Sequence, residues 1–162
     1  MSKKRQMKSA ARFFAVQALF QMEASDQTLD AVQRQFEDIR FGEQFDDFEM
    51  AEGDPDHFRA LTEEALTSQA SIDQMTDRAL AAKWPINRID PTLRALFRAG
   101  GAELLLRDTP PRVVISEFVD VAKAFFPEGR EVKFVNAVLD HMAREIQPEA
   151  MAPRGWGLPG GV

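Results

Sequence analysis

Apolar residues recur at three- and four-residue steps along most of the chain, which is the spacing of amphipathic helices. No segment alternates apolar and polar residues as a half-buried strand would, and no Asn-Gly or Asp-Gly pair indicates a hairpin. The chain has 162 residues, of which 44% are hydrophobic, enough for one domain or two small packed ones. The pattern predicts an all-α protein with two packed helical subdomains and about seven helices.

Capping residues predict the helix boundaries in the first half of the chain. A first helix is expected over residues 8–23, preceded by an N-terminal arm. Thr28 is expected to cap a second helix, and Asp56 a third that breaks near Ser71. The acidic and aromatic segment 41–56 is interpreted as a loop. The inward stripe of the first helix is predicted to be Phe13, Val16, Leu19 and Phe20.

Prolines and glycines predict the boundaries of the second half. Asp90-Pro91 is a strong helix start, and residues 109–111 begin another helix. Gly100-Gly101 in the middle of a helix indicates a close approach by a neighbouring helix. The last helix is expected over residues 130–146, with an inward face of Val132, Val135, Leu139, Met142 and Ile146.

Trp84-Pro85 is the predicted subdomain boundary, because the residue before a proline is disfavoured in the α conformation. Residues 1–83 would form an N-terminal helical subdomain that includes the basic arm, and residues 84–147 a C-terminal one. Residues 148–162 are rich in glycine and proline and are predicted to be a disordered tail.

Charge is unevenly distributed along the chain. The net charge is −6, which argues against indiscriminate nucleic-acid binding. Residues 13–57 hold twelve acidic and two basic residues, whereas residues 1–12 hold five basic and no acidic residues. A basic arm on an acidic body indicates a localised anion site, although a solubilising terminus has the same composition. The five basic residues are Lys3, Lys4, Arg5, Lys8 and Arg12.

Motifs of catalysis and metal binding are absent from the sequence. Without cysteine there is no thiolate zinc site, disulfide or cysteine nucleophile. His57 and His141 lack metal-ligand spacing, and no nucleotide-binding glycine loop or serine elbow occurs. We expect no catalytic residue, no metal and no cofactor. No apolar run approaches the roughly 20 residues of a membrane span, and no signal peptide is evident, so a cytoplasmic protein is expected.

Three segments, taken together and in order, resemble the NusB family of transcription antitermination factors. They are ARFFAVQALF at 11–20, WPINRIDPTLRALFRAGGAELL at 84–105, and PPRVVISEFVDVAKAF at 110–125 followed shortly by KFVNAVLD at 133–140. The third is the most specific, and the resemblance covers about residues 8–147. It implies an all-α fold of two subdomains. It also implies binding of boxA, a single-stranded element of ribosomal RNA leaders, together with NusE, a small-subunit ribosomal protein, in a complex that keeps RNA polymerase elongating.

The resemblance also suggests particular residues. Lys133, Phe134 and Asn136 offer a cation, a stacking face and an amide able to read a base edge, which suit single-stranded RNA. Arg98 is a weaker RNA candidate, because it equally fits an ion-paired helix arginine. Phe20 is a candidate for the partner-binding face, although its place in the stripe also fits the core.

Two other functions fit the same pattern. The chain could be a helical protein-interaction module without RNA binding, in which case the basic arm is incidental. It could also be a stand-alone relative of the RNA-binding domain of ribosomal RNA methyltransferases, which share this helical module. RNA binding that survives moderate salt distinguishes the first alternative, and incubation with a methyl donor and ribosomal RNA tests the second.

Overall fold

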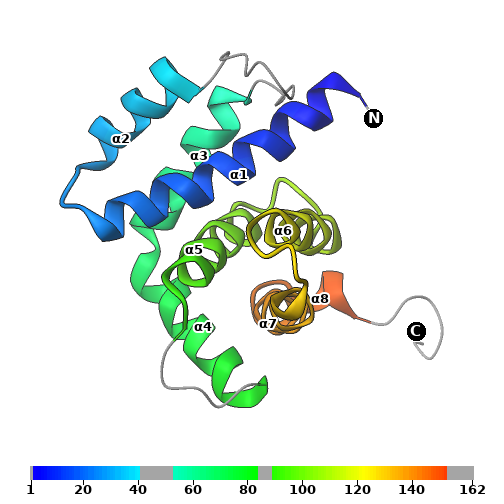
Figure 1. Ribbon diagram of the computed structural model, residues 1–162. Coiled ribbons are helices and arrows are strands. Elements are labelled where there is room, and N and C mark those ends of the chain that lie inside the picture. The colour runs from blue at the N-terminus through cyan, green and yellow to red at the C-terminus, as the bar shows by residue number, and fades with distance from the viewer. Residues whose placement is uncertain (1, 41–52, 84–88, 153–162) are drawn as a thin grey trace.

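The computed structural model describes residues 2–40, 53–83 and 89–152, and within these ranges every regular element is helical (Figure 1). The all-α prediction is therefore confirmed. None of the helices in the described ranges has the length and apolar character needed to cross a membrane. In chain order the elements are α1 (Lys3–Ala24), α2 (Leu29–Gln35), the short π-helix η1 (Phe36–Arg40), α3 (Pro55–Thr67), α4 (Gln69–Lys83), α5 (Pro91–Leu106), α6 (Pro111–Phe125), α7 (Arg130–Ile146) and α8 (Pro148–Met151).

Helix α5 lies at the centre of the fold. It packs against α1 and α3 on one side and against α6 and α7 on the other, and it also contacts α4 (Figure 1). The paired glycines of α5 allow this crowding, as predicted. A Cβ atom on Gly100 would lie 2.9 Å from Leu139 Cδ2 in α7, and one on Gly101 would lie 2.8 Å from Ile72 Cγ2 in α4. Because α5 contacts helices on both sides of residue 84, the division into two subdomains stays a prediction.

Most of the predicted helix starts are confirmed. The Thr28 side chain accepts a hydrogen bond from the Ala31 N–H at 3.2 Å, and Asp90 accepts one from the Thr92 N–H at 2.7 Å. Helix α7 has the predicted bounds, and Val135, at 0% exposure, lies at the centre of its inward face. These local signals act within one helical turn, so the sequence alone is sufficient to place them.

Three predicted boundaries in the first half are wrong. Helix α1 begins at Lys3, because the Ser2 side chain accepts a hydrogen bond from the Arg5 N–H, so the basic residues lie on a helix and not on a loose arm. Helix α3 begins at Pro55, capped by Asp54 in place of Asp56. The break that follows lies at Ser68, three residues before the predicted position. Most of the predicted loop, residues 41–52, lies outside the described residues.

The inward face of α1 also differs from the predicted stripe. Val16 and Leu19 are buried as expected, but Phe13 is half-buried and Phe20 is 40% exposed. The core is filled instead by Phe14, with small residues beside it. Ala11, Ala15 and Ala18 are each 0% exposed. Alanines let α1 approach α5 closely, which turns the larger Phe13 and Phe20 toward the surface.

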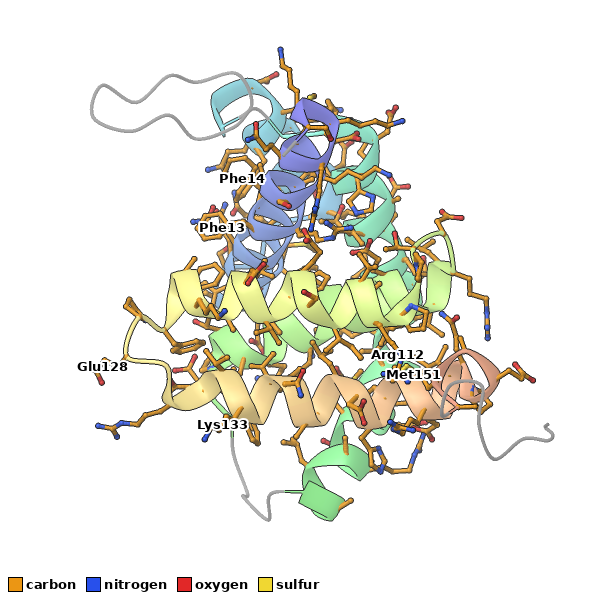
Figure 2. All side chains as sticks on the ribbon, turned by 90° about the vertical axis from the view of Figure 1, so that its right-hand side faces the viewer. Phe13, Phe14, Arg112, Glu128, Lys133 and Met151 are labelled. Atoms are coloured by element: carbon orange, nitrogen blue, oxygen red, sulfur yellow. The ribbon has the colours of Figure 1, made fainter. Side chains whose placement is uncertain are left out.

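The first residues of the predicted tail are ordered, so the prediction of disorder is wrong for them. Residues 148–151 form α8, and Met151 is 1% exposed. The guanidinium groups of Arg112 and Arg144 donate hydrogen bonds to the Met151 carbonyl at 3.2 and 3.1 Å, and Figure 2 shows Arg112 beside Met151. The Gln147 amide donates to the Leu104 carbonyl at 2.9 Å. The rest of the tail lies outside the described residues.

Candidate nucleic-acid interface

Among the residues that the structure describes, the lysines predicted to bind RNA have no ionic partner. In the parts of the chain that the structure describes, no carboxylate oxygen lies within 4.0 Å of the side-chain nitrogen of Lys3, Lys4, Lys8 or Lys133. Lys3 and Lys4 are exposed in the first turn of α1, Lys8 is half-buried one turn later, and Lys133 is exposed near the start of α7. These four side chains are therefore available to phosphate groups.

The predicted RNA-binding arginines differ from the lysines because they have carboxylate partners, and the contact of Arg5 is the weakest of these. Its side chain is 62% exposed, and its Nη2 atom lies 3.7 Å from Glu117 Oε2 in α6. A contact of this length at an exposed site is weak, so Arg5 remains able to bind an anion. It stays among the predicted RNA-binding residues.

Arg12 is not an RNA-binding residue, and that prediction is wrong. The residue is 3% exposed, and its guanidinium is held by two carboxylates from other helices. Its Nε and Nη2 atoms donate to Glu103 at 2.7 and 2.8 Å, and its Nη1 atom donates to Glu117 at 2.8 Å. A guanidinium buried and paired in this way cannot reach a phosphate. Arg12 instead ties α1 to α5 and α6.

Glu103 is the most deeply buried acid of this network. Besides Arg12, its carboxylate accepts a hydrogen bond from Thr109 at 2.9 Å, and His57 Nε2 lies 3.2 Å from Oε2. Burial alone would raise the pKa of Glu103, but the contacts with Arg12 and His57 outweigh it and lower the pKa to about 2. Glu103 is therefore a carboxylate at neutral pH, and the network is ionic.

Arg98 is also paired, as one of its two interpretations predicted. Its side chain is 12% exposed, and its Nε and Nη2 atoms donate to the two carboxylate oxygens of Asp73 at 3.0 and 2.8 Å. The hydrogen bonds to Asp73 raise the pKa of Arg98 above its usual value. This fork-to-fork geometry fixes α5 against α4. The ion pair with Asp73 thus favours a structural role for Arg98 over contact with RNA.

The start of α7 presents the other predicted RNA-binding residues at the surface. Lys133 and Asn136 are exposed, and Phe134 is half-buried. The Phe134 ring meets the buried Phe97 ring edge-to-face, with centroids 6.0 Å apart. Phe134 therefore sits at the rim of the core, anchored on one side, which agrees with its position about 100° round the helix from the buried Val135. A cation, an aromatic ring and an amide lie within one helical turn here.

Phe20 lies on the surface of α1. Within the described residues it is one of three large apolar side chains classed as exposed, with Leu66 and Val113. Its 40% exposure favours the partner-face interpretation over the core interpretation. That Phe20 binds a partner stays a prediction.

The sequence analysis did not identify a stacked pair of aromatic residues, Phe13 and Phe125, at the junction of α1 and α6. The rings of Phe13 in α1 and Phe125 at the end of α6 are stacked, with centroids 4.8 Å apart and planes 13° apart. Both residues are half-buried. Figure 2 shows Phe13 on the side of the molecule where the connection from α6 to α7, with Glu128, and Lys133 also lie. The predicted stripe of the first helix places Phe13 in the core, and the structure shows its ring stacked on Phe125 near the surface.

Metal ligands do not gather anywhere in the described part of the chain, where no group of three or more histidine or acidic side chains could hold an ion. Several of the ion pairs that do occur there join different helices, such as those of Arg12 with Glu103 and of Arg98 with Asp73.

Comparison with known proteins finds a family match and relatives over most of the chain. Residues 9–144 match the model of the NusB family. The chain is 46% identical over 144 residues to the transcription antitermination protein NusB of Maricaulis maris, an alignment that covers 88% of this chain and 89% of that protein. It is 40% identical over 158 residues to the protein of the same name from Granulibacter bethesdensis, covering 94% and 96% of the two chains.

Solved structures agree in fold. The T. maritima NusB structure superposes with a TM-score of 0.64 at 29% identity, covering 90% of this chain and 92% of the other. A structure of the antitermination factors NusB and NusE in complex with dsRNA contains a chain that superposes with a TM-score of 0.67. That chain is 22% identical, and the match covers 90% of this chain and 99% of that one.

Proposed function

Because the chain belongs to the NusB family, we propose that it is an RNA-binding transcription antitermination factor that acts with NusE. Its RNA target is a single-stranded boxA-type element of ribosomal RNA leaders, and the complex supports processive elongation by RNA polymerase. A factor that acts on transcripts during their synthesis works in the bacterial cytoplasm. The protein is a binding subunit and not an enzyme.

The observation that best supports RNA binding is the contrast between the lysines and the arginines. Most arginines with a described side chain are paired with carboxylates, whereas Lys3, Lys4, Lys8 and Lys133 are not. Unpaired cations lose less favourable interaction when they move to phosphate, because no internal ion pair has to break. Lys133 adjoins the half-buried Phe134, so charge and a stacking face come together.

Replacing these four lysines with glutamine should weaken RNA binding at low salt and flatten its salt dependence. Each phosphate contact to single-stranded RNA contributes roughly −0.7 to the slope of log K against log salt, so four contacts contribute roughly −3. The measurement is an RNA titration by fluorescence anisotropy at several salt concentrations. Lys123→Gln is the matched control, because Lys123 is also a surface lysine but lies 3.6 Å from Asp120. Superimposable slopes for the four-lysine variant and the wild type would exclude these lysines as phosphate contacts.

We expect NusE to bind the face of α1 that carries Phe20, and to bind cooperatively with RNA. If the two proteins each supply part of the RNA surface, NusE raises RNA affinity, and RNA tightens the protein pair by the same factor. Calorimetry measures both factors: RNA is titrated with and without NusE, and NusE is titrated with and without RNA. Phe20→Ser should weaken NusE binding, whereas Leu66→Ser, an equally exposed position on α3, should not. Equal effects of the two substitutions would place the partner elsewhere.

The alternatives make different predictions in the same assays. A protein-interaction module without RNA binding would show no salt-dependent RNA affinity with or without NusE. A relative of the methyltransferase module would bind ribosomal RNA without responding to NusE. Methyl transfer to ribosomal RNA by the isolated chain would contradict the proposal that it has no catalytic activity.

A further inference from the structure

The stacked pair of Phe13 and Phe125 forms an aromatic surface at the junction of two helices. Phe13 lies in α1 and Phe125 is the last residue of α6, and their rings are nearly parallel. On its other side Phe13 meets Phe14 edge-to-face, with centroids 6.0 Å apart. Phe14 is 3% exposed, so the pair is anchored to the core while part of it remains exposed. The two stacked rings therefore form an aromatic surface that is held in place by the core.

The exposed face of α1 continues this surface. Phe20 lies seven residues after Phe13, which on a helix is about 20° away and about 10 Å further along the axis. Gln17 lies between the two rings on the same face and is half-buried. A contiguous group of apolar side chains on a surface is typical of an interaction site. The rings therefore mark a contact surface and not an extension of the core.

The charges around the pair favour an anionic occupant. The acids of α6 and of the following connection each have a basic partner: Glu117 pairs with Arg12, Asp120 lies 3.6 Å from Lys123, and Glu128 lies 3.9 Å from Arg130. Among the described residues, no carboxylate lies within 4.0 Å of the side-chain nitrogens of Lys3, Lys4 and Lys8, which precede Phe13 on α1, or of Lys133, which lies in α7 after the end of α6 at Phe125. Aromatic rings flanked by unpaired cations suit a strand with stacked bases and charged phosphates. A purely apolar protein segment would leave these cations without partners.

We propose that the Phe13–Phe125 pair is a second base-stacking site for single-stranded RNA. Phe13 follows the basic first turns on α1, and Phe125 at the end of α6 precedes the Lys133–Phe134 site of α7, so one strand would contact all three. This proposal rests on the proposed RNA-binding function and extends it to two residues of separate helices. The ligand group is an unpaired nucleobase, whose flat face meets the exposed part of the aromatic pair.

The test uses Phe13→Leu and Phe125→Leu in the full chain, because leucine keeps the apolar contact and removes the flat ring. The probe is a boxA-type single-stranded RNA carrying 2-aminopurine, whose fluorescence reports stacking. We expect each variant to bind RNA about five- to tenfold more weakly than the wild type, the lower part of the range for losing one base–aromatic stack. The double variant should be no weaker than either single one, because the rings act as a unit. Val113→Ala, an exposed position elsewhere on α6, is the control for apolar truncation.

Two comparisons separate this proposal from the proposed function. Phe134→Leu should weaken RNA binding independently of Phe13→Leu, and trimming the RNA from one end should abolish the effect of one substitution before the other. If the wild type binds no RNA, the proposed function fails. If the wild type binds RNA and Phe134→Leu weakens it while Phe13→Leu does not, only the second site fails. Loss of NusE affinity with unchanged RNA affinity in Phe13→Leu would assign the pair to the protein partner and overturn the proposal, as would a melting temperature lowered enough to account for the weaker binding.

Discussion

Replacing Arg12 with methionine is expected to lower the free energy of unfolding by about 3–5 kcal/mol, the usual effect of removing one partner from a buried ion pair. Methionine fills most of the volume but leaves Glu103 and Glu117 buried without their cation. Both carboxylates then lose charge-assisted hydrogen bonds of 2.7–2.8 Å. Chemical denaturation followed by circular dichroism measures the change.

A matched substitution controls for the loss of an arginine as such. Arg34 forms an ion pair with Asp30 at 2.8 Å, but both side chains are well exposed, so Arg34→Met should cost less than about 1 kcal/mol. Adding Glu103→Gln and Glu117→Gln to Arg12→Met should recover part of the loss, because neutral amides are cheaper to bury than unpaired carboxylates. Equal stabilities for Arg12→Met and Arg34→Met would show that the network contributes little.

The misassignment of Arg12 shows where sequence reasoning stops. Its partners Glu103 and Glu117 lie 91 and 105 residues away, so nothing near Arg12 in the sequence indicates that it is neutralised. The first twelve residues contain five basic side chains, and only the fold distinguishes the buried Arg12 from the other four. Arg98 and Asp73 repeat the lesson over 25 residues. Ion pairs between helices are tertiary contacts and leave no periodic signal.

Helix boundaries followed the opposite rule. Thr28 and Asp90 cap their helices within three residues, and Pro91 stands in the first turn, so local chemistry was sufficient. At α3, Asp54 caps the helix in place of the predicted Asp56, although both are aspartates close to the helix start. The choice was made by packing, because Asp54 also donates its backbone N–H to the Met7 carbonyl of α1.

The predicted inward face of α1 is wrong, and this affects the candidate site more than any other incorrect prediction. A stripe of large apolar residues predicted that Phe13 and Phe20 point inward, but α1 buries its alanines and Phe14. Hydrophobic periodicity weighs residues by apolarity and does not register how closely two helices approach. Once α1 lies close against α5, only small side chains fit between them, and the bulky rings become surface. The candidate RNA and partner surfaces exist because of that displacement.

The buried ion pairs of Arg12 with Glu103 and Glu117 make the free energy of unfolding depend on pH. The direction of this dependence follows from the pKa of Glu103. Its pKa is lowered from 4.5 to about 2 in the folded protein, since the contacts with Arg12 and His57 outweigh the raising effect of burial. A lowered pKa stabilises the folded state fully above the unfolded pKa, and the contribution disappears as pH falls through the folded pKa. Glu103 should therefore contribute about 3 kcal/mol above pH 4.5, and this should be lost between pH 4.5 and 2.

Comparing the wild type with Glu103→Gln across this range isolates that contribution from those of other carboxylates. The difference between their free energies of unfolding should be constant above pH 4.5 and shrink by about 3 kcal/mol toward pH 2, because glutamine does not titrate there. In the Arg12→Met background the lowering by Arg12 is gone and the raising effect of burial remains, so the difference should no longer shrink toward pH 2. Parallel pH curves for the wild type and Glu103→Gln would mean that Glu103 titrates alike in the folded and unfolded chains. The ion pair with Arg12 would then not be what holds α1, and with it the lysines of its first turns, against the rest of the fold.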